Sequence, residues 1–139
     1  MIFIILEETQ MSDSKKSEAK LGVIEWCDLT VDNADKVKDF YSSVVGWESS
    51  SVSMGEYDDY NINLPKSGDT IAGICHARGS NRNLPAQWLM YVRVEDVSVS
   101  AQKCRELGGD ILDGPRKMGA ENFCVIKDPE GAVLALVSS

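Results

Sequence analysis

The pattern of apolar and polar positions from residue 21 onward predicts a strand, then a helix, then three more strands. Residues 21–31, LGVIEWCDLTV, have the β-branched and aromatic content of a strand. A helix is expected next, because Asp32 or Asn33 can cap its start and Gly46 can end it. Its apolar positions recur at helical spacing and are Val37, Phe40, Tyr41 and Val44. The turn-separated stretches ESSSVSM, YDDYNINL and TIAGICHA then predict three strands.

The second half of the chain predicts the same order of elements. QWLMYVRV at 87–94 is typical of a strand, the helix after it ends at Gly108-Gly109, and DILD, ENFCVIKD and AVLALV predict three further strands. The landmarks of the two halves coincide at one offset of 63 residues, which pairs Val31 with Val94, Asp32 with Glu95, Gly46 with Gly109 and Gly68 with Gly131. We interpret this as an internal duplication of a βαβββ module; coincidence between two ordinary α+β segments is the alternative.

The predicted fold class is therefore α+β, with two βαβββ modules in tandem that form a curved mixed sheet with a concave cleft. One module buries only the face of its sheet that lies under its own helix, so the other face needs a second cover. Two modules side by side supply that cover and leave a cleft on the concave face. We expect an N-terminal extension and linker at 1–20 and one domain at 21–137, with its modules at 21–79 and 86–137.

Strand alternation predicts which side chains face the cleft. In the first strand the helix-covered core takes Cys27, Leu29 and Val31, and the cleft takes Trp26, Asp28 and Thr30. In the matching strand the core takes Met90, Val92 and Val94, and the cleft takes Leu89, Tyr91 and Arg93. The shared faces of the two last strands are Thr70, Ala72, Ile74 and His76 in one half and Val133, Ala135 and Val137 in the other. This alternation places His76 on the cleft face.

Composition and charge narrow the expected partners and compartment. A chain of 139 residues that is 43% hydrophobic can bury a core without disulfide or metal staples. The net charge is −8 and no basic patch carries interleaved aromatic residues, so nucleic acid is not an expected partner. The four cysteines form no CxxC pair, so we expect them to be reduced and mostly buried.

The N-terminal stretch MIFIILEE lacks the basic flank and cleavage site of a secretion signal and is too short to span a membrane. We therefore expect a cytoplasmic protein with no membrane partner. Met11 is a candidate natural start, which would leave residues 1–10 upstream of it. Alternatively, Ile2 to Leu6 add an edge strand or pack on a partner subunit.

Several short motifs carry a family resemblance. They are the strand ending at Val31-Asp32, Phe40-Tyr41 followed by Gly46-Trp47, the strand Trp88 to Val94, Leu107-Gly108-Gly109 and the turn Asp128-Pro129-Glu130-Gly131. Across residues 22–137 this pattern resembles the vicinal oxygen chelate superfamily, which includes glyoxalase I, bleomycin-resistance proteins, extradiol dioxygenases, fosfomycin-resistance enzymes and methylmalonyl-CoA epimerase. The resemblance implies the fold, but this fold carries many chemistries.

The resemblance also implies four metal-ligand positions, two in each module. Carried onto this sequence they are Trp26, Ala72, Leu89 and Ala135. None of these side chains can bind a divalent metal, which needs imidazole, carboxylate or thiolate donors. The chain has one histidine, His76, so a site with two histidines and a carboxylate cannot be built within it. We therefore expect no family-type metal and no other cofactor.

The candidate ligand-binding residues are Trp26, Asp28, Leu89, Tyr91, Arg93 and His76. Trp26 could stack an aromatic or cationic group, or it could plug the cleft or pack at a subunit interface. Asp28 and Arg93 could orient a polar ligand, or they could form a structural ion pair with each other. His76 could be a general base or a hydrogen-bonded structural residue. Tyr57 to Tyr60 add aromatic and acidic groups near the cleft rim.

The function predicted from these residues is metal-independent binding of a small organic molecule, aromatic or cationic, by a homodimer. No catalytic residue can be named. The enzyme alternative is a glyoxalase-like lyase, isomerase or dioxygenase with a metal at an atypical site that includes His76. Carboxylates converging on His76 would favour that alternative. A third hypothesis is an interaction module whose cleft is filled by its own side chains or by a partner chain.

Overall fold

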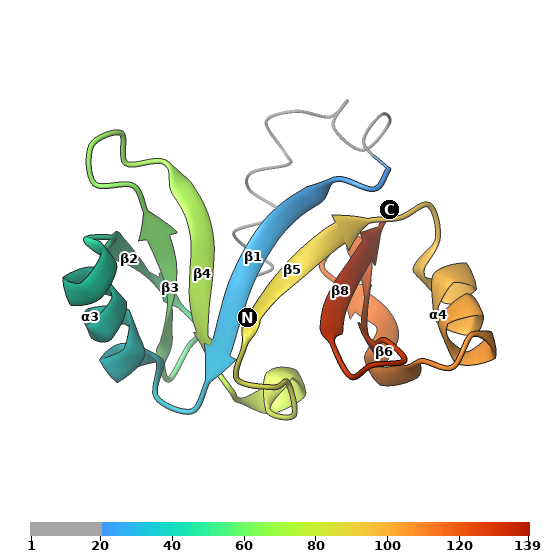
Figure 1. Ribbon diagram of the computed structural model, residues 1–139. Helices are drawn as coiled ribbons and strands as arrows, with labels where there is room; N and C mark the ends of the chain where they lie inside the picture. The colour runs from blue at the N-terminus through green and yellow to red at the C-terminus, as the bar shows by residue number, and fades with distance from the viewer. Residues whose placement is uncertain (1–20) are drawn as a thin grey trace. The chain divides into compact units, whose positions relative to one another are not determined.

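The computed structural model describes residues 21–139, so the expectations for residues 1–20 lie outside the described part of the chain. Two βαβββ runs follow one another, as predicted (Figure 1). The first run comprises β1 (Ile24–Val31), α3 (Ala34–Val45), β2 (Glu48–Ser53), β3 (Asp58–Asn63) and β4 (Thr70–His76). After a 3₁₀ turn at Gly79–Asn81, the second comprises β5 (Trp88–Arg93), α4 (Val97–Glu106), β6 (Asp110–Met118), β7 (Glu121–Lys127) and β8 (Val133–Ser138). Within residues 21–139 no helix has the length and apolarity to cross a membrane.

The described chain divides into two compact units. The first unit holds residues 27–88, and the second holds residues 21–26 together with 89–139, so the start of β1 belongs to the second unit. The first has the strand order β2-β3-β4-β1, in which β1 and β4 are parallel and the other pairs are antiparallel. The second has the order β5-β8-β7-β6, with β5 and β8 parallel. The α+β class with mixed sheet pairing is confirmed, and the predicted domain limits remain a prediction.

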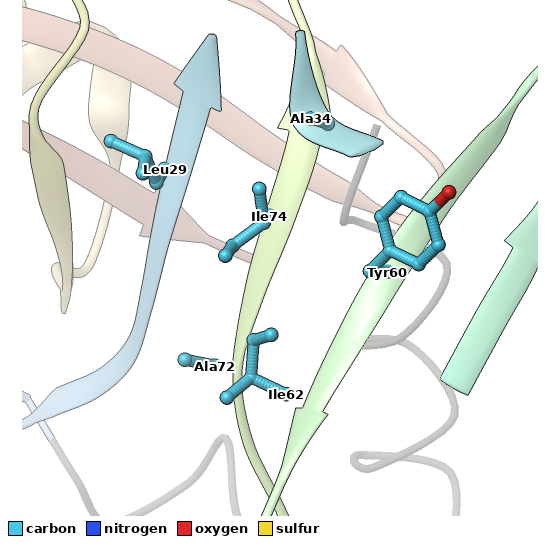
Figure 2. Close-up of a cluster of buried hydrophobic side chains, with 6 residues drawn as sticks. All are labelled: Leu29, Ala34, Tyr60, Ile62, Ala72 and Ile74. Carbon is cyan, nitrogen blue, oxygen red and sulfur yellow. The ribbon is translucent and has the colours of Figure 1, made fainter. Parts of the chain in front are cut away.

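The core of the first unit lies between α3 and the sheet. Its buried residues are Leu29, Ala34, Tyr60, Ile62, Ala72 and Ile74 (Figure 2). The helix begins where the Asn33 side chain accepts a hydrogen bond from the Lys36 amide at 3.0 Å. It ends at Gly46, whose φ of 89° is a left-handed conformation that glycine adopts without strain. Of the four predicted apolar helix positions, Val37 and Tyr41 pack on this core, whereas Phe40 and Val44 are exposed.

The predicted face of β4 is wrong. In the parallel pair, Leu29 lies opposite Ile74 and Val31 lies opposite His76, so the Ile74 and His76 side of β4 is the side that α3 covers. Asp28 pairs with Gly73, whereas Tyr91, its counterpart in the second unit, pairs with Ala135. The structural counterpart of Ala135 is therefore Gly73 and not Ala72. A slip of one residue between the two halves moves every side chain of a strand to the other face.

The core of the second unit lies between α4 and the sheet. Val97, Ala101, Cys124 and Leu136 are buried there, and Val92 and Val94 pack against them as predicted. Met90 is 43% exposed, so its assignment to the core was wrong. It lines an apolar hollow with Ile126 and Leu134 instead. A second correction concerns β6, which continues well beyond the DILD stretch to Met118 and contains a cis peptide bond at Gly114-Pro115.

Gly109, at the end of α4, is expected to tolerate no side chain. A Cβ atom there would lie 2.5 Å from Cys104 Sγ and 2.7 Å from the Lys127 carbonyl oxygen. We expect Gly109→Ala to lower the free energy of unfolding by about 1–3 kcal/mol, the usual cost of overpacking, as measured by urea denaturation. Adding Cys104→Ala should recover only part of the loss, because the Lys127 oxygen stays in place. A Gly109→Ala protein as stable as the wild type would contradict this account.

Candidate functional site

Arg93, at the end of β5, is the centre of a buried ion cluster in the second unit. Its Nε and Nη2 donate to the two carboxylate oxygens of Glu25 at 3.1 and 2.6 Å. Its Nη1 and Nη2 donate to those of Glu121 at 3.1 and 2.7 Å. The side chains of Arg93 and Glu25 are each 2% exposed and that of Glu121 is 7% exposed. One guanidinium therefore holds two carboxylates out of water through paired, fork-like hydrogen bonds.

The electrostatics of this cluster keep Arg93 charged. Burial by itself lowers the pKa of Arg93, but the hydrogen bonds that it donates to Glu121 and Glu25 outweigh burial and raise that pKa above its ordinary value. The sequence suggested Asp28 or a ligand carboxylate as the partner of Arg93. The structure gives its guanidinium two protein carboxylates, so Arg93 has a structural role whether or not a ligand binds nearby.

Glu25 was not among the predicted site residues, because it precedes Trp26 on the strand and simple alternation places it on the opposite side, towards the helix or an edge. Just before β1, the Gly22 amide donates to the Arg93 carbonyl at 2.7 Å, and the Arg93 amide donates to the Val23 carbonyl at 3.0 Å. Gly22 and Val23 thus lie opposite the single residue Arg93, which is the pattern of a β-bulge. A bulge re-aims the side chains that follow it, and this accounts for Glu25 reaching Arg93. No signal in the sequence marks that bulge except Gly22.

Trp26, Leu89 and Tyr91, predicted to line the ligand site, are buried residues of the second unit at 6%, 3% and 2% exposure. The Tyr91 ring stacks on Phe123, with ring centroids 5.8 Å apart. The Trp26 indole nitrogen is buried and donates to no acceptor among residues 21–139. A buried N–H group without a hydrogen-bond acceptor is uncommon in folded proteins, so an acceptor atom of a bound ligand is a natural partner for it. Asp28, also predicted to bind the ligand, lies in the first unit and is 1% exposed.

His76, at the end of β4, belongs to the first unit. Its Nδ1 lies 2.9 Å from the Asp58 carbonyl oxygen and 3.5 Å from Asp59 Oδ1, while its Nε2 lies 3.9 Å from Asp35 Oδ1. The His76 backbone amide also donates to Asp59 Oδ1, at 2.8 Å. Asp35 comes from the first turn of α3, and Asp58 and Asp59 begin β3. The sequence placed Asp58 and Asp59 near a cleft rim but gave no sign that they reach the one histidine.

Carboxylates do converge on His76, as the enzyme alternative requires, yet the arrangement is poor for a metal. Nδ1 is already engaged by the Asp58 carbonyl, which leaves Nε2 and Asp35 as the facing pair. Within residues 21–139 no group of three or more histidine, cysteine, aspartate or glutamate side chains is placed to hold a metal ion. A metal site normally needs at least three protein ligands.

Tyr60 donates its phenol hydrogen bond to Asp35 beside His76, and this bond, followed by burial, raises the pKa of Tyr60 to about 12. Because the folded pKa lies above the ordinary value of 10.0, the stabilisation is complete below pH 10 and is lost as the pH rises through about 12. An absorbance titration of phenolate should show a tyrosine that titrates near pH 12, absent in Tyr60→Phe and retained in Tyr41→Phe. If Tyr60→Phe instead removes a tyrosine that titrates near pH 10, the raised pKa does not belong to Tyr60.

Comparison with known proteins identifies the family. A family model described as Glyoxalase/Bleomycin resistance protein/Dioxygenase superfamily matches residues 23–136. The chain belongs to this superfamily. Curated relatives include CFP32 of Mycobacterium tuberculosis and of Mycobacterium bovis, provisionally named a glyoxylase, at 29% identity over 128 residues. That match covers 88% of this chain and 48% of theirs, so the chain spans about half the length of these curated relatives.

Solved structures of other superfamily proteins share the fold. A Streptomyces coelicolor methylmalonyl-CoA epimerase in complex with 2-nitronate-propionyl-CoA has a TM-score of 0.52 at 17% identity, covering 86% of this chain and 96% of that one. The methylmalonyl-CoA epimerase of Mycobacterium tuberculosis has a TM-score of 0.50 at 16% identity, covering 86% and 90%. At such identities the likeness shows the fold alone.

The residues at the superfamily's metal positions do not fit a metal. With the corrected register of β4, these positions hold Trp26, Gly73, Leu89 and Ala135. An indole, a hydrogen, an isobutyl group and a methyl group supply no donor for a divalent ion. The correction from Ala72 to Gly73 changes the residue but not the outcome, because neither side chain has a ligand atom.

Proposed function

We propose that this chain is a small-molecule-binding member of the superfamily that works without a metal at the family positions. The observation that carries the proposal is the donor chemistry at Trp26, Gly73, Leu89 and Ala135, where no side chain can ligate a divalent ion. The ligand binds against Trp26, Leu89 and Tyr91 and is an aromatic or cationic organic molecule.

The buried indole N–H of Trp26 supports this site, because a hydrogen-bond acceptor on the ligand would complete it. Tyr91 adds a ring that Phe123 already holds in a fixed orientation. Arg93 acts in this proposal as a positioning residue, since Glu25 and Glu121 occupy its guanidinium. The side chains of Trp26, Leu89 and Tyr91, here called the Trp26 wall, would therefore give the ligand a largely apolar contact surface with one hydrogen-bond donor, the Trp26 indole.

The first experiment is elemental analysis of the metal content of protein that was purified without chelators or metal-affinity columns. We expect no stoichiometric metal. Zinc, iron, nickel or manganese at one ion per chain would overturn the proposal and favour the enzyme alternative with an atypical site. A screen of aromatic and cationic compounds by tryptophan fluorescence then follows, and Trp26→Phe should abolish a response that Trp47→Phe retains.

A cytoplasmic homodimer belongs to the same proposal. All four cysteines are free thiols, which suits a reducing compartment. The chain spans about half the length of its curated relatives, so two copies together would match their size. Light scattering coupled to gel filtration measures the mass directly, and a mass equal to one chain at micromolar concentration would refute the dimer.

A further inference from the structure

A polar hollow of about 490 Å³ lies in the first unit, at the end of β4. Its lining includes Asp35, Glu56, Tyr57, Tyr60, His76 and Arg78. The residues come from the start of α3, from the turn before β3, from the strands β3 and β4, and from the segment that follows β4. None of them belongs to the metal positions of the superfamily or to the Trp26 wall, so the hollow is a separate feature.

His76 presents one ring nitrogen to this hollow as a hydrogen-bond acceptor. The Asp58 carbonyl can only accept, so the Nδ1 atom 2.9 Å away must carry the proton. In the neutral ring, Nε2 is then left with a lone pair. The side chain is only 7% exposed, and within residues 21–139 its Nε2 makes no hydrogen bond, the nearest carboxylate oxygen being Asp35 Oδ1 at 3.9 Å. The Nε2 lone pair therefore lies at the hollow beside the carboxylate of Asp35, at 3.9 Å from its Oδ1.

The charge around this acceptor is negative, which selects the sign of the ligand. Asp35, Glu56 and Asp58 contribute three carboxylates to the lining, against one guanidinium from Arg78. The two tyrosine rings already attract cations of the chain itself. The Arg78 guanidinium lies 4.6 Å from the Tyr57 ring centre, and the Lys38 ammonium lies 5.0 Å from that of Tyr60. Because these rings already hold cations of the chain, the three carboxylates of the lining select the ligand charge, and they repel an anion and attract a cation.

We propose that this hollow is a second binding site, for a small organic molecule bearing a primary ammonium group. The Nε2 and Asp35 Oδ1 atoms are too far apart to bond each other, at 3.9 Å. One ammonium nitrogen, however, can lie about 2.8 Å from both of them and donate a hydrogen to each. Its third hydrogen is then free for Glu56, Asp58 or water. The proposal does not rest on the metal-independent function or on the Trp26 wall.

The test uses the only histidine of the chain as its own reporter. Ethylammonium chloride is titrated into the full-length protein near pH 8, where an ordinary imidazole is neutral, and the imidazole signals are followed by NMR. We expect a saturable shift of the His76 signals. Tetramethylammonium carries the same charge without an N–H donor, so we expect it to leave those signals in place. No saturable shift with ethylammonium, or an equal shift with both cations, would overturn the proposal.

A matched pair of variants separates the site from general charge. Asp35→Asn keeps an oxygen acceptor for Tyr60 and should weaken ethylammonium binding about tenfold or more, the loss expected for one charge-assisted hydrogen bond. Asp39→Asn removes the same charge from the same helix, where Asp39 pairs with Lys38, and should bind like the wild type. Equal affinity in Asp35→Asn and the wild type would show that Nε2 and Asp35 do not form the site.

Discussion

Arg93→Met is expected to lower the free energy of unfolding by about 3–5 kcal/mol, because it removes the guanidinium that pairs with Glu25 and Glu121 in a buried ion cluster. The carboxylates of Glu25 and Glu121 are 2% and 7% exposed, and each receives two hydrogen bonds from the guanidinium. Methionine fills a similar volume but deprives both buried carboxylates of the hydrogen bonds and charge of the guanidinium. Urea denaturation at neutral pH measures the loss.

Two further variants decide whether the effect comes from the uncompensated charges. Arg116→Met breaks a pair with Asp113 that is 25% and 19% exposed, so we expect it to cost at most about 1 kcal/mol. A triple variant, Arg93→Met with Glu25→Leu and Glu121→Leu, should recover most of the stability, because well-packed apolar groups can replace a buried ion cluster. If Arg93→Met costs no more than Arg116→Met, the cluster does not stabilise the fold as described.

Phe123→Ala is expected to cost about 3–5 kcal/mol, the usual range for truncating a buried aromatic residue. Phe123 is 0% exposed, stacks on Tyr91 and lies 4.9 Å below the Arg116 guanidinium. The cavity would leave Tyr91 without its stacking partner, so ligand affinity at the Trp26 wall should fall as well. Thermal or urea denaturation measures the first effect, and tryptophan fluorescence measures the second.

Phe40→Ala is the matched control for this prediction. It deletes the same side chain from the outer face of α3, where Phe40 is 56% exposed and contacts Tyr41 edge-on. We expect a change within about 1 kcal/mol, since little area leaves the core. Similar losses for Phe123→Ala and Phe40→Ala would mean that the burial of Phe123 is not what stabilises the second unit.

The sequence was sufficient for the order of elements and for the family. Local periodicity separates strands from helices, and the caps at Asn33 and Gly46 lie where the chain pattern placed them. The repeated landmarks indicated two βαβββ modules, and three of the four metal positions, Trp26, Leu89 and Ala135, kept their predicted residues once the register of β4 was known. These features are patterns of residue types along the chain, so they can be predicted from the sequence without knowledge of which segments pair in space.

The faces of strands and the partners of buried polar groups were decided only by the tertiary structure. Ala72 and His76 were assigned to the wrong side of β4, and Glu25 was not predicted to reach Arg93, because a one-residue slip or a bulge leaves the local pattern unchanged but reverses the side chains. The convergence of Asp35 and Asp59 on His76 likewise joins segments distant in the chain. Strand pairing is a long-range choice, set by which register buries the most apolar surface and pairs the buried charges.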